Sequence, residues 1–77
     1  MKTLQVLGPG CAKCEALAAN AQAAARAAGA EVEIQKITDV NEIMKFGVML
    51  TPALAVDGEV KVVGRVPPPE ELRELLG

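Results

Sequence analysis

Four short stretches of the chain have the residue pattern of β-strands. Residues 3–7 and 31–37 alternate apolar and polar side chains, which is typical of a strand with one buried face. Residues 53–56 and 59–63 are separated only by Asp57-Gly58, a dipeptide that supplies the two positive-φ positions of a tight turn. We therefore expect four strands, of which the last two form an antiparallel hairpin.

Three other stretches favour helices. Residues 11–28 contain ten Ala, the residue that loses the least side-chain entropy on entering a helix, and Gly29 is the expected stop. A short helix is expected between Asp39, an N-cap in capping-box register with Glu42, and Gly47. After three consecutive prolines, a leucine stripe at helical spacing predicts a short last helix.

The predicted order of elements is β-α-β-α-β-β-α. Because a long helix connects the first two strands, they should be parallel, with a right-handed crossover. The sequence thus predicts one α/β domain over residues 1–77, with a four-stranded mixed sheet and helices on both faces.

Composition and charge exclude several classes of protein. A net charge of −2, with acidic and basic residues interspersed, argues against nucleic-acid binding. The uncharged stretch at residues 16–25 is too short and too rich in Ala to span a bilayer. No signal-like segment precedes the first strand, so a cytoplasmic location is expected. The chain has no His, which excludes Ser-His-Asp catalysis, Cys-His catalysis and His-ligated metal sites.

The candidate chemistry lies at Cys11-Ala12-Lys13-Cys14. Two Cys three residues apart at the opening of a helix share one face and are close enough for a disulfide. Cys11 lies among the unpaired backbone N–H groups of the helix N-terminus, which together with Lys13 should lower the pKa of its thiol. Two buried core thiols, or a structural disulfide closing so small a loop, are weaker interpretations.

The main alternative is a soft-metal site of the Cu(I), zinc or arsenic type, because two thiolates suit such metals. Heavy-metal-associated carriers share the order strand, Cys-x-x-Cys, helix, but they end in a strand and carry Met where this chain has Pro9. A four-Cys zinc or iron–sulfur site would require a dimer, so no metal ligands are assigned. A third hypothesis is a redox-regulated adaptor, whose disulfide state changes its fit to a partner without turnover.

Thr51-Pro52 is the second informative pair. A Pro at the start of a strand has no N–H for the ladder, and by itself it marks only where a strand begins. Together, however, residues 7–14, 38–40, 43–48 and 51–60 make the chain similar to the thioredoxin-fold superfamily. Within it, the chain resembles the very small group called redox-active disulfide protein 2. The similarity runs over nearly the whole length, in the right order.

The resemblance implies roles for the candidate residues. It implies that Pro52 follows a cis peptide bond beside the two Cys, and that the Thr51 backbone pairs with an extended substrate segment. It also implies that Cys11 is the attacking thiolate and Cys14 the resolving thiol. Lys13 would tune the pKa of the Cys11 thiol.

The chain also departs from typical thioredoxins. Gly10 replaces the Trp before the first Cys, and Ala12-Lys13 replaces Gly-Pro between the two, so the redox potential does not carry over. The buried acid of thioredoxins has no counterpart, because Gln5 and Val6 occupy that stretch. The glutathione site of glutaredoxins needs a Gly-Gly pair and an acidic residue before the last helix. Residues 63–67 contain one Gly followed by the basic Arg65, so glutathione binding is not predicted.

The sequence therefore predicts a thiol–disulfide oxidoreductase that works through its own redox-active disulfide. No bound cofactor is expected, but an external reductant is required to reset the dithiol. The expected substrates of the Cys11–Cys14 pair are protein or small-molecule disulfides, and the expected protein partners are a protein disulfide and a reductase. We expect a monomer that neither binds nucleic acid nor inserts into a membrane.

Overall fold

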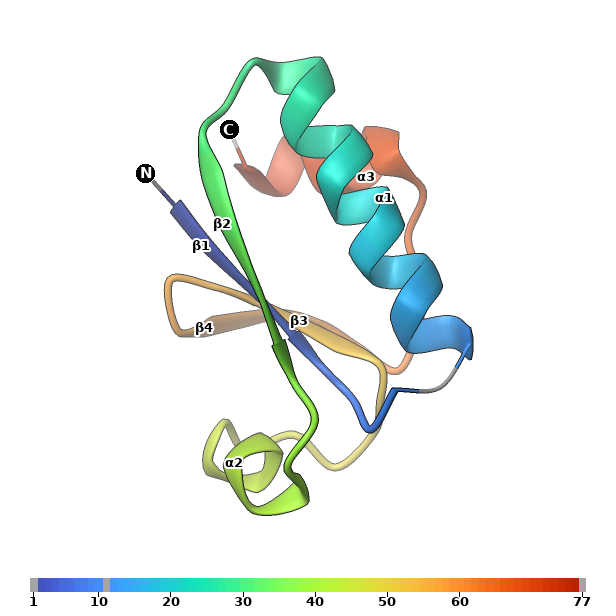
Figure 1. Cartoon of the computed structure of the whole chain (residues 1–77), viewed down its shortest axis with the longest axis vertical. Coiled ribbons are helices and arrows are strands. Elements are labelled where there is room, and N and C mark those ends of the chain that lie inside the picture. The colour runs from blue at the N-terminus through green and yellow to red at the C-terminus, as the bar shows by residue number, and fades with distance from the viewer. Residues whose placement is uncertain (1, 11, 77) are drawn as a thin grey trace.

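The computed structural model describes residues 2–10 and 12–76, and seven elements follow one another in the predicted order (Figure 1). They are β1 (Lys2–Leu7), α1 (Ala12–Ala28), β2 (Val32–Ile37), α2 (Val40–Lys45), β3 (Ala53–Val56), β4 (Glu59–Val63) and α3 (Pro69–Leu76). The predicted α/β fold is confirmed, and α3 begins at the third of the three prolines. Cys11, the first candidate redox cysteine, lies outside the described residues.

The four strands form one mixed sheet with the order β2-β1-β3-β4. β1 pairs with β2 in parallel, whereas the β1–β3 and β3–β4 pairs are antiparallel. Asp57 and Gly58 form the hairpin turn with φ of 51° and 85°. The carboxylate of Asp57 accepts a hydrogen bond from the backbone N–H of Thr3 at 2.8 Å, which ties this turn to the central strand β1.

The helices cover both faces of the sheet, as predicted, but unequally. α1 and α3 lie side by side on one face, whereas α2 lies apart from them near the end of β2 (Figure 1). Neighbouring residues of a strand point to opposite faces, so Val6 packs in the core under α1 and α3, and Leu7 in the core beside α2. The larger core consists of Leu4, Val6, Leu17, Ala18, Ala21, Ala24, Ala25, Leu54, Val56, Val62, Leu72 and Leu76. The smaller core consists of Leu7, Ile43, Val48 and Ala53.

The buried side of α1 consists mainly of alanine. Apart from Leu17 and Cys14, its buried residues are all Ala, whose small side chain allows close packing against the sheet and α3. The side-chain amide of Asn20 also donates a hydrogen bond to the Pro67 carbonyl at 3.0 Å and so fixes the segment before α3. Among the described helices, none combines the length and the apolar character that crossing a membrane requires.

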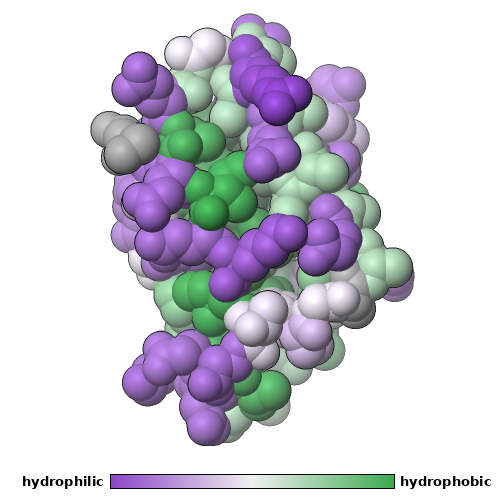
Figure 2. All heavy atoms as spheres, viewed as in Figure 1, coloured by the Kyte–Doolittle hydropathy of each residue, from purple (hydrophilic) through white to green (hydrophobic). Residues whose placement is uncertain are grey.

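The face of the molecule shown in Figure 2 mixes hydrophilic side chains with apolar areas over β2, α1 and α2. Lys36 of β2 and Glu15 of α1 form an ion pair with an N–O distance of 3.0 Å. Both side chains are more than half exposed, so this pair contributes about 0–1 kcal/mol to stability. Its main consequence is to connect the first part of α1 to the edge strand.

Candidate functional site

Cys14 lies near the start of α1 and is buried, with 4 % of its surface exposed. Its side chain lies against Gly8, the residue that directly follows β1. A Cβ built on Gly8 would stand closer than 3.0 Å to the Cys14 Sγ and 3.2 Å from the Cys14 Cβ. The second cysteine of the motif therefore rests on the backbone at the end of the central strand.

Thr51 reaches the same point from another part of the chain. Its Cβ is 3.8 Å from the position that a Gly8 Cβ would occupy. The Thr51–Pro52 peptide bond is cis, Pro52 is buried, and Thr51 is exposed. The structure thus brings Cys14 and the Thr51-Pro52 pair together around Gly8, although they are far apart in the sequence.

The site is poor in buried charge. Among the described residues, no charged or polar side chain is buried, and Lys13 lies exposed in the first turn of α1. Gln5, in the stretch where thioredoxins place a buried acid, instead accepts a hydrogen bond from the backbone N–H of Gly58 at 3.0 Å. Within the described part of the chain, Cys14 therefore has no buried acid or base beside it.

Arg65 and Glu71 form a hydrogen bond and an ion pair. This hydrogen bond lowers the pKa of the Glu71 carboxyl and raises the pKa of the Arg65 guanidinium. Glu71 is in the first turn of α3, where a negative charge is also favoured by the helix dipole. The pair connects the segment after β4 to α3.

An apolar groove of about 350 Å³ lies next to the Cys14 site. Its lining consists of Pro9, Val40, Ile43, Met44, Val48, Met49 and Thr51. Thr51 lines the groove and also lies beside Gly8, so the two features are continuous. Met44 and Met49 are 64 % and 95 % exposed, which leaves two flexible, polarisable side chains open to a partner.

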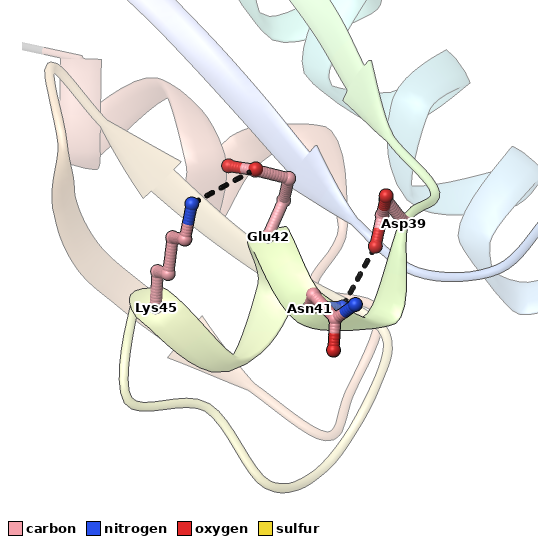
Figure 3. A network of polar contacts seen from close by, with 4 residues as sticks. All are labelled: Asp39, Asn41, Glu42 and Lys45. Atoms are coloured by element: carbon pink, nitrogen blue, oxygen red, sulfur yellow. Dashed lines mark hydrogen bonds and ion pairs between the residues drawn. The ribbon is translucent and has the colours of Figure 1, made fainter.

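α2 forms one side of this groove and is held by polar contacts at its surface (Figure 3). As predicted, Asp39 caps the helix: its carboxylate accepts a hydrogen bond from the backbone N–H of Asn41 at 2.8 Å. The expected capping box differs, because Glu42 forms an ion pair with Lys45 at 3.1 Å. Of the apolar residues in α2, only Ile43 is buried. Val40 and Met44 are exposed and line the groove.

Sequence reasoning missed two features of this site. It treated Gly8 only as the end of a strand, because no local pattern shows which distant atom fills the space of a missing side chain. It also did not identify the groove. The available signal was the apolar run 48–50 placed outside any predicted element, just before Thr51-Pro52.

Comparison with known proteins extends this picture over the whole chain. The family model described as "Thioredoxin domain" matches residues 2–77. The chain is 41% identical over 76 residues to a thioredoxin of Methanothermobacter thermautotrophicus, and the match covers 99% of each protein. It is 38% identical over 76 residues to a thioredoxin of Methanocaldococcus jannaschii, with 99% of this chain and 87% of that relative covered. With its fold and its Cys-x-x-Cys motif, the chain therefore belongs to the thioredoxin family of thiol–disulfide oxidoreductases.

Proposed function

We propose that this protein exchanges a Cys11–Cys14 disulfide with disulfides of partner proteins. The observation that carries the proposal is the convergence of Cys14 and Thr51 on Gly8 in a chain of the thioredoxin family. This arrangement supports a dithiol placed beside a backbone segment that can hold a substrate. A dithiol of this kind works in a reducing compartment, which agrees with the expected cytoplasmic location.

The reaction proceeds through a mixed disulfide. The Cys11 thiolate attacks one sulfur of the substrate disulfide, and the other substrate sulfur leaves as a thiolate that takes up a proton. Cys14 then loses its proton and attacks the Cys11 sulfur, which releases the second substrate thiol and leaves the Cys11–Cys14 disulfide. The substrate gains two electrons, and an external dithiol returns the protein to its reduced form by the reverse exchange.

The proton steps depend on the surroundings of each thiol. A helix N-terminus and a nearby positive charge such as that of Lys13 favour a thiolate, which supports Cys11 as the attacking group. During resolution Cys14 loses its proton to water or to another group. Neither step calls for a bound cofactor.

The partner binds across Thr51 and the apolar groove. An extended segment of the partner pairs with the Thr51 backbone, and a large apolar side chain next to its disulfide enters the groove lined by Met44 and Met49. The groove is continuous with the Cys14 site through Thr51. This continuity supports the disulfide substrate itself as the occupant.

Trapping of mixed disulfides tests the assignment of roles. Cys14→Ser should accumulate protein bound to partner thiols, because the resolving step is lost, whereas Cys11→Ser should trap none. The products are separated without reductant and identified by intact mass. Equal trapping by the two variants would contradict the roles given to Cys11 and Cys14.

Two further measurements separate this function from the other hypotheses. Metal is first assayed in protein purified under reducing conditions, and stoichiometric metal that prevents disulfide formation would favour a metal-binding module. The protein is then equilibrated with defined dithiothreitol buffers and alkylated. A single two-electron transition supports the oxidoreductase, whereas a disulfide that exchanges slowly with every reductant would favour the adaptor.

A further inference from the structure

We propose that Gly8 is a positioning residue for the second half of this exchange reaction. The space left by its missing side chain holds the Cys14 sulfur in the place from which it attacks the mixed disulfide. The inference rests on the proposed function, because it assigns Gly8 to the resolving step. It adds a residue outside the Cys-x-x-Cys motif to the reaction.

The contact between Gly8 and Cys14 is too close for any other residue. A Cβ on Gly8 would lie less than 3.0 Å from the Cys14 Sγ, which is closer than Cβ atoms approach other heavy atoms in proteins. It would also lie only 3.2 Å from the Cys14 Cβ. The sulfur therefore occupies the volume of a side chain at position 8. Even the smallest side chain, that of Ala, has to displace it.

Backbone conformation does not explain the glycine at this position. The glycines with positive φ are residues 10, 29, 47, 58 and 64, and Gly8 is not one of them. An L-residue can therefore adopt the backbone geometry of Gly8 without strain in the left-handed region. The requirement at position 8 is for space beside the sulfur.

Neither partner in this contact can withdraw easily. The N–H of Gly8 donates to the Ile37 carbonyl at 2.9 Å, and the preceding residue, Leu7, is fully buried in the sheet. On the other side, α1 is fixed by Leu17, whose side chain is also fully buried. A new methyl group at position 8 is therefore accommodated mainly by moving the Cys14 sulfur.

Displacement of this sulfur affects only one of the two chemical steps. Formation of the mixed disulfide uses the Cys11 thiolate and the substrate, with no bond to Cys14. Resolution requires the Cys14 sulfur to approach the Cys11 sulfur in line with the bond that breaks. Because a misplacement of about 1 Å can slow a positioned reaction about 100-fold, we expect resolution in Gly8→Ala to slow by about 10- to 100-fold.

The aromatic disulfide 5,5′-dithiobis(2-nitrobenzoate) separates the two steps. Attack by Cys11 releases a first coloured thiolate, and resolution by Cys14 releases a second, so stopped-flow absorbance records both on the reduced protein. In Gly8→Ala, the first release should keep its rate within about twofold while the second slows about 10- to 100-fold. The control is Gly29→Ala, at a glycine with φ of 65° and no atom within 4 Å of its Cβ position, which should leave both rates unchanged.

The outcomes distinguish the inference from the proposed function. If both releases in Gly8→Ala keep their wild-type rates, or both slow equally, Gly8 has no positioning role in resolution. If the wild-type protein shows no second release at all, the two-cysteine mechanism itself is wrong.

A double variant keeps the inference testable if Gly8→Ala unfolds. Removal of the sulfur in Gly8→Ala/Cys14→Ala should restore a melting temperature close to that of Cys14→Ala alone. The first release should then have the same rate in these two variants. If the double variant is as unstable as Gly8→Ala, the displaced atom is not the sulfur and the inference fails.

Discussion

The backbone carbonyl of Pro52 accepts a hydrogen bond from the N–H of Gly64 at 2.8 Å. The residue after β4 thus holds the proline that precedes β3, at the point where the sheet meets the Cys14 site. Gly64 has a φ of 74°, and its Cβ position lies 3.4 Å from two side-chain atoms of Leu50. Gly64 therefore contacts the segment before Thr51 as well as Pro52.

Gly64→Ala should destabilise the protein about as much as a glycine replacement with conformational strain alone. The left-handed conformation costs an L-residue about 1–2 kcal/mol, and at position 64 the methyl group meets the exposed Leu50 side chain at 3.4 Å, an ordinary van der Waals distance. Gly47→Ala is the matched control, because Gly47 has a φ of 77° but no atom within 4 Å of its Cβ position. Urea unfolding followed by circular dichroism measures both, since the chain has no Trp or Tyr. A clearly larger loss of stability in Gly64→Ala would show that the Leu50 side chain cannot adjust to the methyl group.

Met49→Gln should weaken the reaction with protein-like substrates without changing the thiol chemistry. The thioether is 95 % exposed and lines the groove, so the loss of its partial burial against a partner corresponds to about 1 kcal/mol, or about fivefold in kcat/KM. The substrates are two disulfide peptides with Leu or Ser next to the cysteine. The loss should appear with the Leu peptide and not with the Ser peptide, and Ala23→Gln on the exposed side of α1 should react like the wild type. The same loss with both peptides would contradict binding of an apolar side chain in the groove.

Ala24→Leu should destabilise the protein through overpacking. Ala24 is fully buried in the larger core, and added methylene groups in a filled core typically cost about 1–3 kcal/mol. Ala23→Leu places the same side chain on the exposed side of α1 and should change the free energy of unfolding by about 0.5 kcal/mol or less. The urea midpoints of the two variants are compared directly. Similar midpoints would mean that α1 can move away from the sheet.

Glu71 should add a stabilising contribution that is lost in acid. Its pKa is lowered in the folded protein by the hydrogen bond from Arg65, so the contribution is fully present above the ordinary Glu pKa of about 4.3. It disappears as the pH falls through the lower folded value, because the folded chain must then take up the proton. Arg65 stays charged throughout, since its pKa is raised.

Urea midpoints measured between neutral pH and about pH 3 test this linkage. The wild type should lose stability more steeply below about pH 4.3 than Glu71→Gln. The effect should shrink in high salt because both side chains are exposed. Glu70→Gln, one residue earlier in the same helix, serves as control and should keep the wild-type slope. Parallel profiles for the wild type and Glu71→Gln would contradict a stabilising role for the pair.

Most of the fold was predictable because its signals are local. Alternation, the Asp57-Gly58 turn and the alanine content of residues 11–28 each act within one element. Tertiary packing decided which side of α2 is buried. Of its three apolar residues only Ile43 packs against the sheet, because α2 is short and lies at one end of the molecule.

The sequence by itself determined the order of elements, the mixed sheet and the cysteine pair, since each depends on residues close together in the chain. The tertiary structure alone decided that Cys14 rests on Gly8, that Thr51 meets them there, and that Met44 and Met49 open onto a groove beside them. These contacts join the end of β1, the first turn of α1 and the segment before β3. Their geometry depends on how α1 and the segment before β3 pack at the end of β1, and no local pattern of residues specifies that packing.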